Sequence, residues 1–139
     1  SVNLENVYNC GELSKNGARG RGGIVGAIGN IGAVDINSSY NMGKVIEEKL
    51  NTSTYSSGAI CGYRYDVSKE NLKINNSYYL SNTCSVAVGN EDDSGYGITK
   101  LENMTNEELK NYLNEYREKN NKGDWKSWKL GENGYPTFE

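Results

Sequence analysis

Residues 34–42 read Val-Asp-Ile-Asn-Ser-Ser-Tyr-Asn-Met, and they alternate between two kinds of side chain. One face of an extended chain would carry the more apolar set, Val34, Ile36, Ser38, Tyr40 and Met42. The other face would carry the polar set, Asp35, Asn37, Ser39 and Asn41. A period of two is typical of a β-strand with one buried face. The stretch therefore predicts a half-buried strand.

The same alternation occurs twice more, each time with tyrosine at the fourth place of the inner face. The upstream copy carries Val2, Leu4, Asn6, Tyr8 and Cys10, and the downstream copy carries Leu72, Ile74, Asn76, Tyr78 and Leu80. The tyrosines recur after 32 and then 38 residues, a spacing typical of solenoid units. We therefore expect a mainly β chain, a short, β-helix-like β-solenoid of about three stacked repeats over residues 1–102. Equivalent residues such as Val2, Val34 and Leu72 should be parallel neighbours, about 4.8 Å apart.

Short apolar runs between glycines form the second part of each repeat. Gly22-Gly-Ile-Val-Gly26 is matched by Gly58-Ala-Ile-Cys-Gly62, and Ser85-Val-Ala-Val-Gly89 is a remnant of the same run. Each is too short for a helix and is predicted to be a short buried strand with tight corners. Gly11 and Gly43 each come three residues after the repeated tyrosine, and the third copy has Ser81 at the same place. The third copy is thus degenerate, as terminal repeats often are.

From residue 103 the periodicity changes and predicts a helix. Thr105 and Glu108 have the spacing of a capping box, and an apolar stripe follows at helical spacing, consisting of Leu109, Tyr112, Leu113 and Tyr116. The helix should end before Gly123, and an extended tail with Trp125 and Trp128 should follow. We expect residues 103–139 to cap the open end of the stack within a single domain of residues 1–139.

Composition excludes several classes of partner. The net charge of −3 and the isoelectric point near 5.1 give no electrostatic basis for binding nucleic acid or an anionic membrane. No apolar run approaches the roughly 18 residues of a membrane span, so membrane insertion is not expected. The start Ser-Val-Asn-Leu-Glu has no signal-peptide character, so a targeting signal would lie outside this sequence. The hydrophobic fraction of 35% is low, yet it suits strands that bury one face.

Reactive residues are scarce. The chain has no histidine, which excludes His-dependent triads and His-based zinc sites. Cys10, Cys61 and Cys84 are an odd number with no Cys-x-x-Cys, and a disulfide or redox pair is not favoured. Cys10 and Cys61 occupy repeat positions held elsewhere by apolar residues, so we interpret these two as small core residues. The glycines of residues 17–32 do not frame a phosphate loop. No catalytic residue, metal ligand or cofactor is predicted.

Two acidic arrangements stay open. Glu91-Asp92-Asp93 could bind calcium through carboxylate oxygens, but it lacks the alternating ligands of an EF-hand, so a solvated loop is favoured. Paired carboxylates hydrolyse glycosides, and the sequence does not locate such a pair. The basic residues Arg19 and Arg21, and Lys119, Lys122, Lys126 and Lys129 near the tail, are interpreted as solvated surface.

Several of these segments together resemble the GLUG-motif repeats of bacterial secreted and cell-surface proteins. The match is carried by Tyr8-Asn9-Cys10-Gly11, Gly22-Gly-Ile-Val-Gly26, Tyr40-Asn41-Met42-Gly43 and Gly58-Ala-Ile-Cys-Gly62. The order of Asn76-Ser-Tyr-Tyr-Leu80, a helix, a Trp-containing segment and Asn133-Gly-Tyr-Pro136 resembles the way such arrays finish. The resemblance implies a β-solenoid, export from a bacterium, and association with adhesins or with surface proteases such as the immunoglobulin A peptidases. It implies no catalytic residue.

We therefore expect a non-enzymatic repeat module of an exported bacterial surface protein, found outside the cell or on its surface, that serves as a spacer or adhesion surface. Tyr55, Tyr63 and Tyr65 are candidates for contact with a host protein or glycan, or they cover the side of the core. Further repeats or domains of the parent chain are the other expected partners. The alternative function is a polysaccharide-acting enzyme or an accessory domain of a surface protease.

Overall fold

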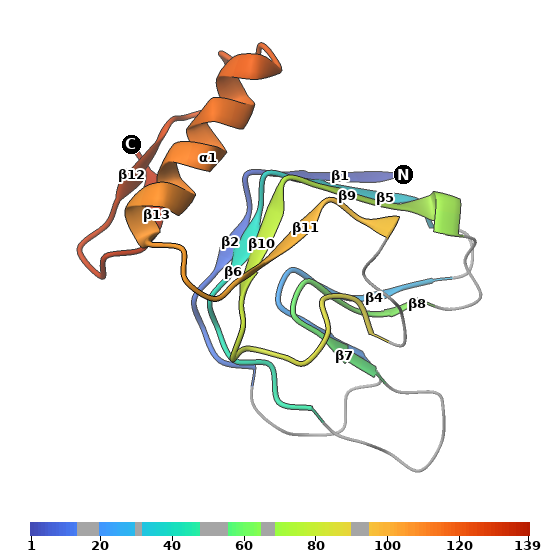
Figure 1. Cartoon of the computed structure of the whole chain (residues 1–139). Coiled ribbons are helices and arrows are strands. Elements are labelled where there is room, and N and C mark those ends of the chain that lie inside the picture. Colours follow the sequence, from blue (N-terminus) through green and yellow to red (C-terminus); the bar gives the residue numbers. More distant parts are fainter. Residues whose placement is uncertain (14–19, 30–31, 48–55, 65–68, 90–94) are drawn as a thin grey trace. The chain divides into compact units, whose positions relative to one another are not determined.

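The computed structural model describes residues 1–13, 20–29, 32–47, 56–64, 69–89 and 95–139. They fall into two compact units, Ser1–Leu101 and Glu102–Glu139, called here the repeat unit and the C-terminal unit. The repeat unit consists mainly of short parallel strands (Figure 1). Tyr55, Tyr65 and the acidic segment Glu91-Asp92-Asp93 lie outside the described residues.

One sheet of the repeat unit joins the beginnings of the three repeats. Its strands are β1 (Val2–Glu5), β5 (Val34–Asn37) and β9 (Leu72–Asn75), in the order β1-β5-β9 (Figure 1). Both pairs are parallel, and each strand residue lies beside its repeat equivalent: Val2, Val34 and Leu72, then Leu4, Ile36 and Ile74. The predicted parallel register is confirmed for these strands.

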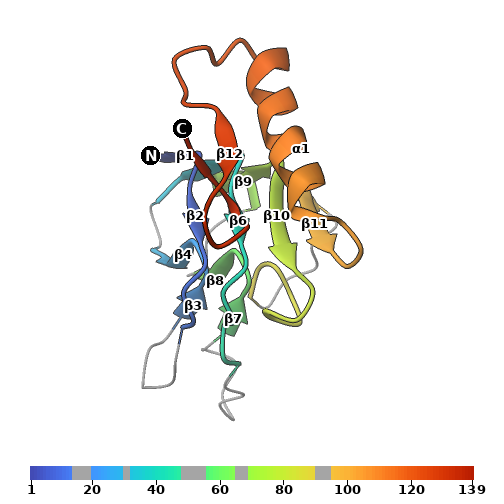
Figure 2. The ribbon, with the colours of Figure 1, turned by 90° about the vertical axis from the view of Figure 1, so that its left-hand side faces the viewer.

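A second sheet carries the tyrosines. Its order is β11-β10-β6-β2, from β11 (Ile98–Leu101), β10 (Ser77–Leu80), β6 (Tyr40–Asn41) and β2 (Tyr8–Asn9) (Figure 2). Tyr8, Tyr40 and Tyr78 are register partners in parallel pairs, as predicted, and the rings of Tyr8 and Tyr40 stack with centroids 5.3 Å apart. Strand β11 is not predicted by the repeat pattern, because it follows the third tyrosine strand without a tyrosine of its own.

The alternating stretches do not form one continuous strand. Each is divided by a corner at which the backbone has positive φ, 54° at Asn6, 52° at Ser38 and 45° at Asn76. Short polar residues tolerate this left-handed conformation better than others.

After the corner the predicted faces no longer hold. Ser39 and Asn41, predicted to lie on the outer face, are fully buried. The prediction for these two is wrong because their side chains bond to the chain inside the stack. Tyr40 and Tyr78, predicted on the inner face, are buried but lie outside the core cluster, which contains Tyr79.

The glycine-flanked runs line the remaining side of the core, but the prediction of one short strand for each is wrong. Each run forms a corner between two strands, with bends at residues 23–24 and 59–60. β3 (Gly20–Gly22) pairs with β7 (Ser56–Gly58), and β4 (Val25–Ile28) pairs with β8 (Cys61–Arg64), all in parallel. The third repeat joins through a bridge between Cys61 and Val88, and a 3-10 turn, η1 (Lys69–Asn71), precedes β9. The core between the sheets contains Ile28, Val34, Ile36, Val45, Ile60, Leu72, Ile74 and Val88.

The C-terminal unit contains the predicted helix, α1 (Asn106–Lys119), which begins with the predicted capping box between Thr105 and Glu108. Leu109 and Leu113 are fully buried, whereas Tyr112, predicted on the same stripe, is 47% exposed because it lies at the edge of the stripe. Strands β12 (Trp128–Leu130) and β13 (Pro136–Phe138) form an antiparallel pair. That this unit caps the stack stays a prediction.

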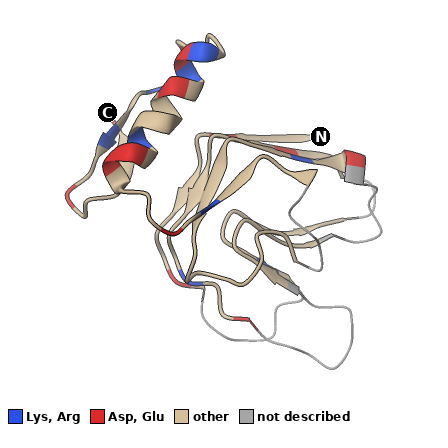
Figure 3. Ribbon diagram, in the orientation of Figure 1, with Lys and Arg blue, Asp and Glu red and all other residues tan. Residues whose placement is uncertain are grey.

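Charged residues gather along the helix, while the stacked strands are mostly uncharged (Figure 3). Within the described ranges, no helix has both the length and the apolar character needed to cross a membrane. An uncharged repeat core and a charged helix agree with the change of periodicity seen in the sequence at residue 103.

Candidate functional site

A cleft of about 440 Å³ opens beside the second and third repeats. It is lined by residues 44–47 and 81–85, the segments that follow β6 and β10. Their backbones meet where the amide of Val45 donates to the carbonyl of Thr83 at 2.8 Å. On the opposite side of this segment, the amide of Leu13 donates to the carbonyl of Lys44 at 2.8 Å. The cleft thus lies where the third repeat departs from the glycine pattern of the first two.

Glu47 is the best-connected side chain of the cleft. Its Oε1 accepts from the backbone amide of Ser85 at 2.7 Å, from Cys84 Sγ at 3.2 Å, and from the Ser85 hydroxyl. Glu47 and Ser85 are 38 residues apart, the same offset that relates Tyr40 to Tyr78, so they are repeat equivalents. The carboxylate therefore joins the second repeat to the third. Their 38-residue offset makes the two positions neighbours in the stack, but neither residue type indicates the contact in the sequence.

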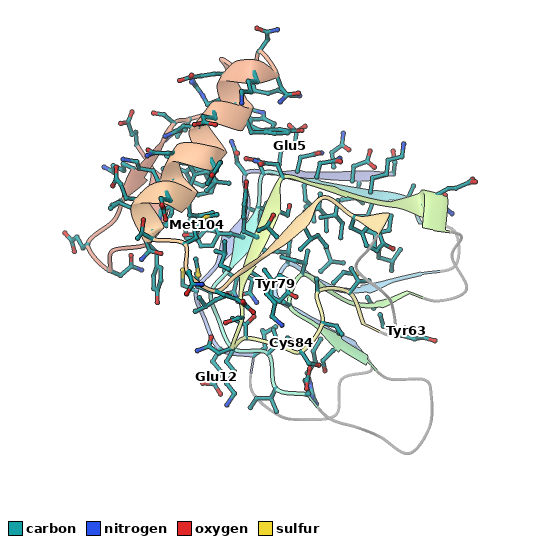
Figure 4. The ribbon with its side chains drawn as sticks, viewed as in Figure 1. Glu5, Glu12, Tyr63, Tyr79, Cys84 and Met104 are labelled. Atoms are coloured by element: carbon teal, nitrogen blue, oxygen red, sulfur yellow. The ribbon has the colours of Figure 1, made fainter. Side chains whose placement is uncertain are left out.

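Cys84 is buried inside the repeat unit (Figure 4). The pKa of its thiol is raised from 9.0 to about 12, chiefly by burial and also by the neighbouring Glu47 carboxylate, against partly opposing backbone hydrogen bonds. Burial likewise raises the pKa of Cys10. Because the thiolate is the nucleophilic form, a thiol with so high a pKa is unreactive at neutral pH. Cys10, Cys61 and Cys84 are free thiols in the structure.

Among the described residues that line the cleft there is one carboxylate, that of Glu47. Glycoside hydrolysis uses two carboxylates flanking the scissile bond, so these lining residues do not supply the pair. Nor do the described residues contain a group of three or more His, Cys, Asp or Glu side chains that could hold a metal ion. The arrangement around Glu47 is that of a structural clamp between repeats.

The remaining sequence candidates are dispersed. Tyr63 lies on β8 beside Ala27 of β4 and is partly exposed on that flank (Figure 4). Arg21 is only 7% exposed and donates through Nη1 to the carbonyl of Ile46 at 3.0 Å, so its interpretation as solvated surface is wrong. Its guanidinium reaches a backbone carbonyl of the second repeat, on which β3 is stacked through its pairing with β7. Arg19 lies outside the described residues.

Lysines of the C-terminal unit have surface contacts. Lys119 lies 3.6 Å from Glu115 in an exposed pair, and Lys122 lies over the ring of Trp125 at 5.1 Å from its centroid. Lys126 and Lys129 are exposed. Within the C-terminal unit these lysines therefore lie at the surface, as predicted.

No family model, curated protein or solved structure matches this chain. Inferences about function therefore rest on the geometry of the repeats, of the cleft and of the flank that carries Tyr63.

Proposed function

We propose that the repeat unit is a short β-solenoid, and that the chain is a non-enzymatic module of an exported bacterial surface protein. It serves as a spacer or as a binding surface in adhesion. The observation that carries this proposal is the residue-by-residue parallel register of the repeats, in which equivalent side chains of successive copies lie side by side. Repeat architectures of this kind present extended surfaces to partners.

The polar interior supports a scaffolding role. Asn41 is fully buried, and its amide nitrogen donates to the carbonyls of Ala59 at 2.8 Å and Gly43 at 3.0 Å. At the surface, the exposed carboxylate of Glu47 accepts hydrogen bonds from Cys84 and Ser85 and so joins two repeats there. Buried polar groups in the stack are thus used to hold chain segments together, because an unpaired polar group there would cost stability.

The flank formed by β4 and β8 is the proposed contact surface. Tyr63 lies beside the small residue Ala27, and tyrosine side chains combine apolar area with a polar tip, which suits contact with proteins and sugars. A host protein or a glycan is the proposed partner class.

A binding screen tests the proposal. The purified chain is applied to a glycan array and to immobilised extracellular matrix proteins, and release of reducing sugar is followed in parallel. We expect retention on at least one surface, weakened at least tenfold by Tyr63→Ala and unchanged by Tyr112→Ala, which alters an exposed tyrosine of the C-terminal unit.

The rival function is a polysaccharide-acting enzyme. Sugar release that disappears in Glu47→Gln, with the fold retained by circular dichroism, would overturn the non-enzymatic proposal. Retention that is equally weakened by Tyr63→Ala and Tyr112→Ala would overturn the assignment of the flank.

A further inference from the structure

The first repeat has an outer edge that resembles the inside of the stack. We infer that this edge, made of β1 and β2 with Gly11 and Gly26, is a docking surface for a further strand of the same repeat, one that carries Tyr-Asn-x-Gly in parallel register. This docking depends only on the stacked repeats. It would occur even if the chain bound no host protein or glycan.

Gly11 and Gly43 provide the first line of support. A Cβ at Gly43 would fall on the carbonyl of Gly11 in the preceding repeat, and 2.8 Å from Asn9 Nδ2, so the second repeat requires glycine there. A Cβ at Gly11 would meet, among described atoms, only Asn9 Oδ1 at 3.4 Å. The backbone of Gly11 has no positive φ that would call for glycine. The missing side chain at Gly11 is therefore explained by a neighbouring strand that the structure does not contain.

Gly26 and Gly62 repeat the observation on another side of the core. A Cβ at Gly62 would collide with the backbone of Arg21 and with the carbonyl of Gly26, both in the first repeat. At Gly26 the equivalent Cβ would meet, among described atoms, only the carbonyl of Gly20 at 3.4 Å, within its own repeat. Two glycines from different strands thus leave room on the same outer edge, each where its counterpart contacts the preceding copy.

The asparagine pair gives the edge a chemical preference. Asn41 Oδ1 accepts from the amide of Gly43 at 2.9 Å and from Asn9 Nδ2 at 2.9 Å. Asn9 Oδ1 accepts from the amide of Gly11 at 3.0 Å, the equivalent of the first of these bonds. By the same geometry, the amide nitrogen of an asparagine in an added strand would donate to Asn9 Oδ1. This contact is specific, because it needs an asparagine directly after the stacked tyrosine.

Exposure and backbone geometry agree with docking at this edge. Val2 is 52% exposed and Tyr8 37%, whereas their partners Val34 and Tyr40 are 8% and 0% exposed. The amides of Val2 and Asn6 donate toward β5, so the alternation of a parallel ladder directs the backbone groups of Asn3 outward. An added strand would cover both the apolar side chains and this backbone edge.

The added strand comes from a further repeat and not from strand β11 of a second copy of this chain. At that end β11 places Thr99 and Lys100 at the tyrosine and asparagine positions of the register. Thr99 has no ring to stack on Tyr8, so β11 lacks the aromatic contact that Tyr40 makes with Tyr8 on the other side. A strand with Tyr-Asn-x-Gly supplies the stacking ring, the donor to Asn9 and the glycine carbonyl that fits over Gly11.

An extended chain tests the docking surface. A second copy of residues 1–32 is fused ahead of Ser1, which reproduces the 32-residue spacing between Tyr8 and Tyr40. We expect a single cooperative unfolding transition with the melting temperature raised by about 5 °C or more, and at least tenfold slower hydrogen exchange at the amide of Asn3. An added segment that exchanges freely and leaves the melting temperature unchanged would overturn the inference.

Matched glycine variants separate docking from folding. Gly11→Ala should leave the unextended chain unaffected and abolish the gain in melting temperature of the extended chain. Gly43→Ala should destabilise both chains. If Gly11→Ala changed the melting temperature of the two chains equally, docking would be contradicted. It would also be contradicted if the unextended chain were a dimer in which the Asn3 amide is already protected from exchange. Loss of the glycan or protein binding tested above would leave these outcomes unchanged, so the two proposals fail separately.

Discussion

At the scale of single residues, Asn41 shows how the stack is held. It is fully buried and makes hydrogen bonds to Gly43 in its own corner, to Ala59 across the core and to Asn9 in the preceding repeat. The same residue type at Asn9 makes the corresponding bonds at a half-buried edge. One side chain therefore fixes both the corner of a repeat and its register on the next.

Replacing Asn41 should be costly. Asn41→Ala removes four hydrogen bonds from a site without solvent, and we expect a loss of about 2–4 kcal/mol in the free energy of unfolding. Asn9→Ala is the matched control and should cost about 1 kcal/mol or less, because water can replace its partners at the edge. Urea unfolding followed by circular dichroism measures both, and equal losses would show that Asn41 has no special role.

Cys84 should make stability depend on alkaline pH. The folded pKa of about 12 lies above the ordinary 9.0, so the folded chain keeps a proton that the unfolded chain releases between these values. Its contribution to stability is complete below pH 9 and is lost as the pH rises from 9 toward 12. We expect the unfolding free energy of the wild type to fall more steeply over pH 9–11 than that of Cys84→Ser. Parallel curves for the two proteins would contradict the raised pKa.

At the scale of elements, helix α1 and the tail are joined by side chains on one flank of the helix. Asn114 donates through Nδ2 to the carbonyl of Trp128 at 2.9 Å and accepts from its amide at 2.8 Å. Arg117 donates to the carbonyls of Trp125 at 2.7 Å and Gly123 at 3.1 Å. The ring of Trp128 lies against Phe138, with centroids 4.5 Å apart. Polar anchors thus position an aromatic contact between the strands of the tail.

Asn114→Ala should release the tail from the helix. Two hydrogen bonds to Trp128 are lost, so we expect a destabilisation of the C-terminal unit by about 2 kcal/mol and faster hydrogen exchange at the Trp128 amide. Asn111→Ala, an exposed position one turn earlier, is the control and should have little effect. The assignment fails if the two variants exchange at the same rate.

The elements differ in how far the sequence predicts them. The alternation around Ile36 and the repeated tyrosines predict the parallel register, because in stacked repeats equivalent residues become neighbours. The corners at Ser38 and its equivalents are missed, since alternation alone does not reveal a left-handed residue inside an apparently continuous strand. Strand β11 is missed because it lacks the tyrosine motif of the repeats.

The candidate site is less predictable than the fold. The contact of Glu47 with Ser85 depends on stacking of segments 38 residues apart, and neither residue type indicates it locally. The burial of Arg21 is likewise a result of the stack, since an arginine among glycines reads as surface when taken alone. Sequence patterns predict the ladders, whereas contacts between loops of different repeats require the structure.

At the scale of the whole molecule, the repeat unit and the C-terminal unit are separately compact. We predict from the sequence that residues 103–139 cap the stack. Deleting them should therefore cause self-association, because unpaired strand edges recruit other chains. Analytical ultracentrifugation and thermal unfolding test this. A truncated chain that stays monomeric with an unchanged melting temperature would refute the cap and leave the repeat unit as an independent domain.

Stacking of the repeats in parallel register is tested most directly by nuclear Overhauser contacts in the labelled protein. We expect contacts from the Ile36 methyl groups to both Leu4 and Ile74, and from the Tyr40 ring to both Tyr8 and Tyr78. We also expect the amide-to-Hα pattern of parallel strands between β5 and its two neighbours. A folded protein that instead shows strong Hα-to-Hα contacts between these strands, the signature of antiparallel pairing, would contradict parallel stacking.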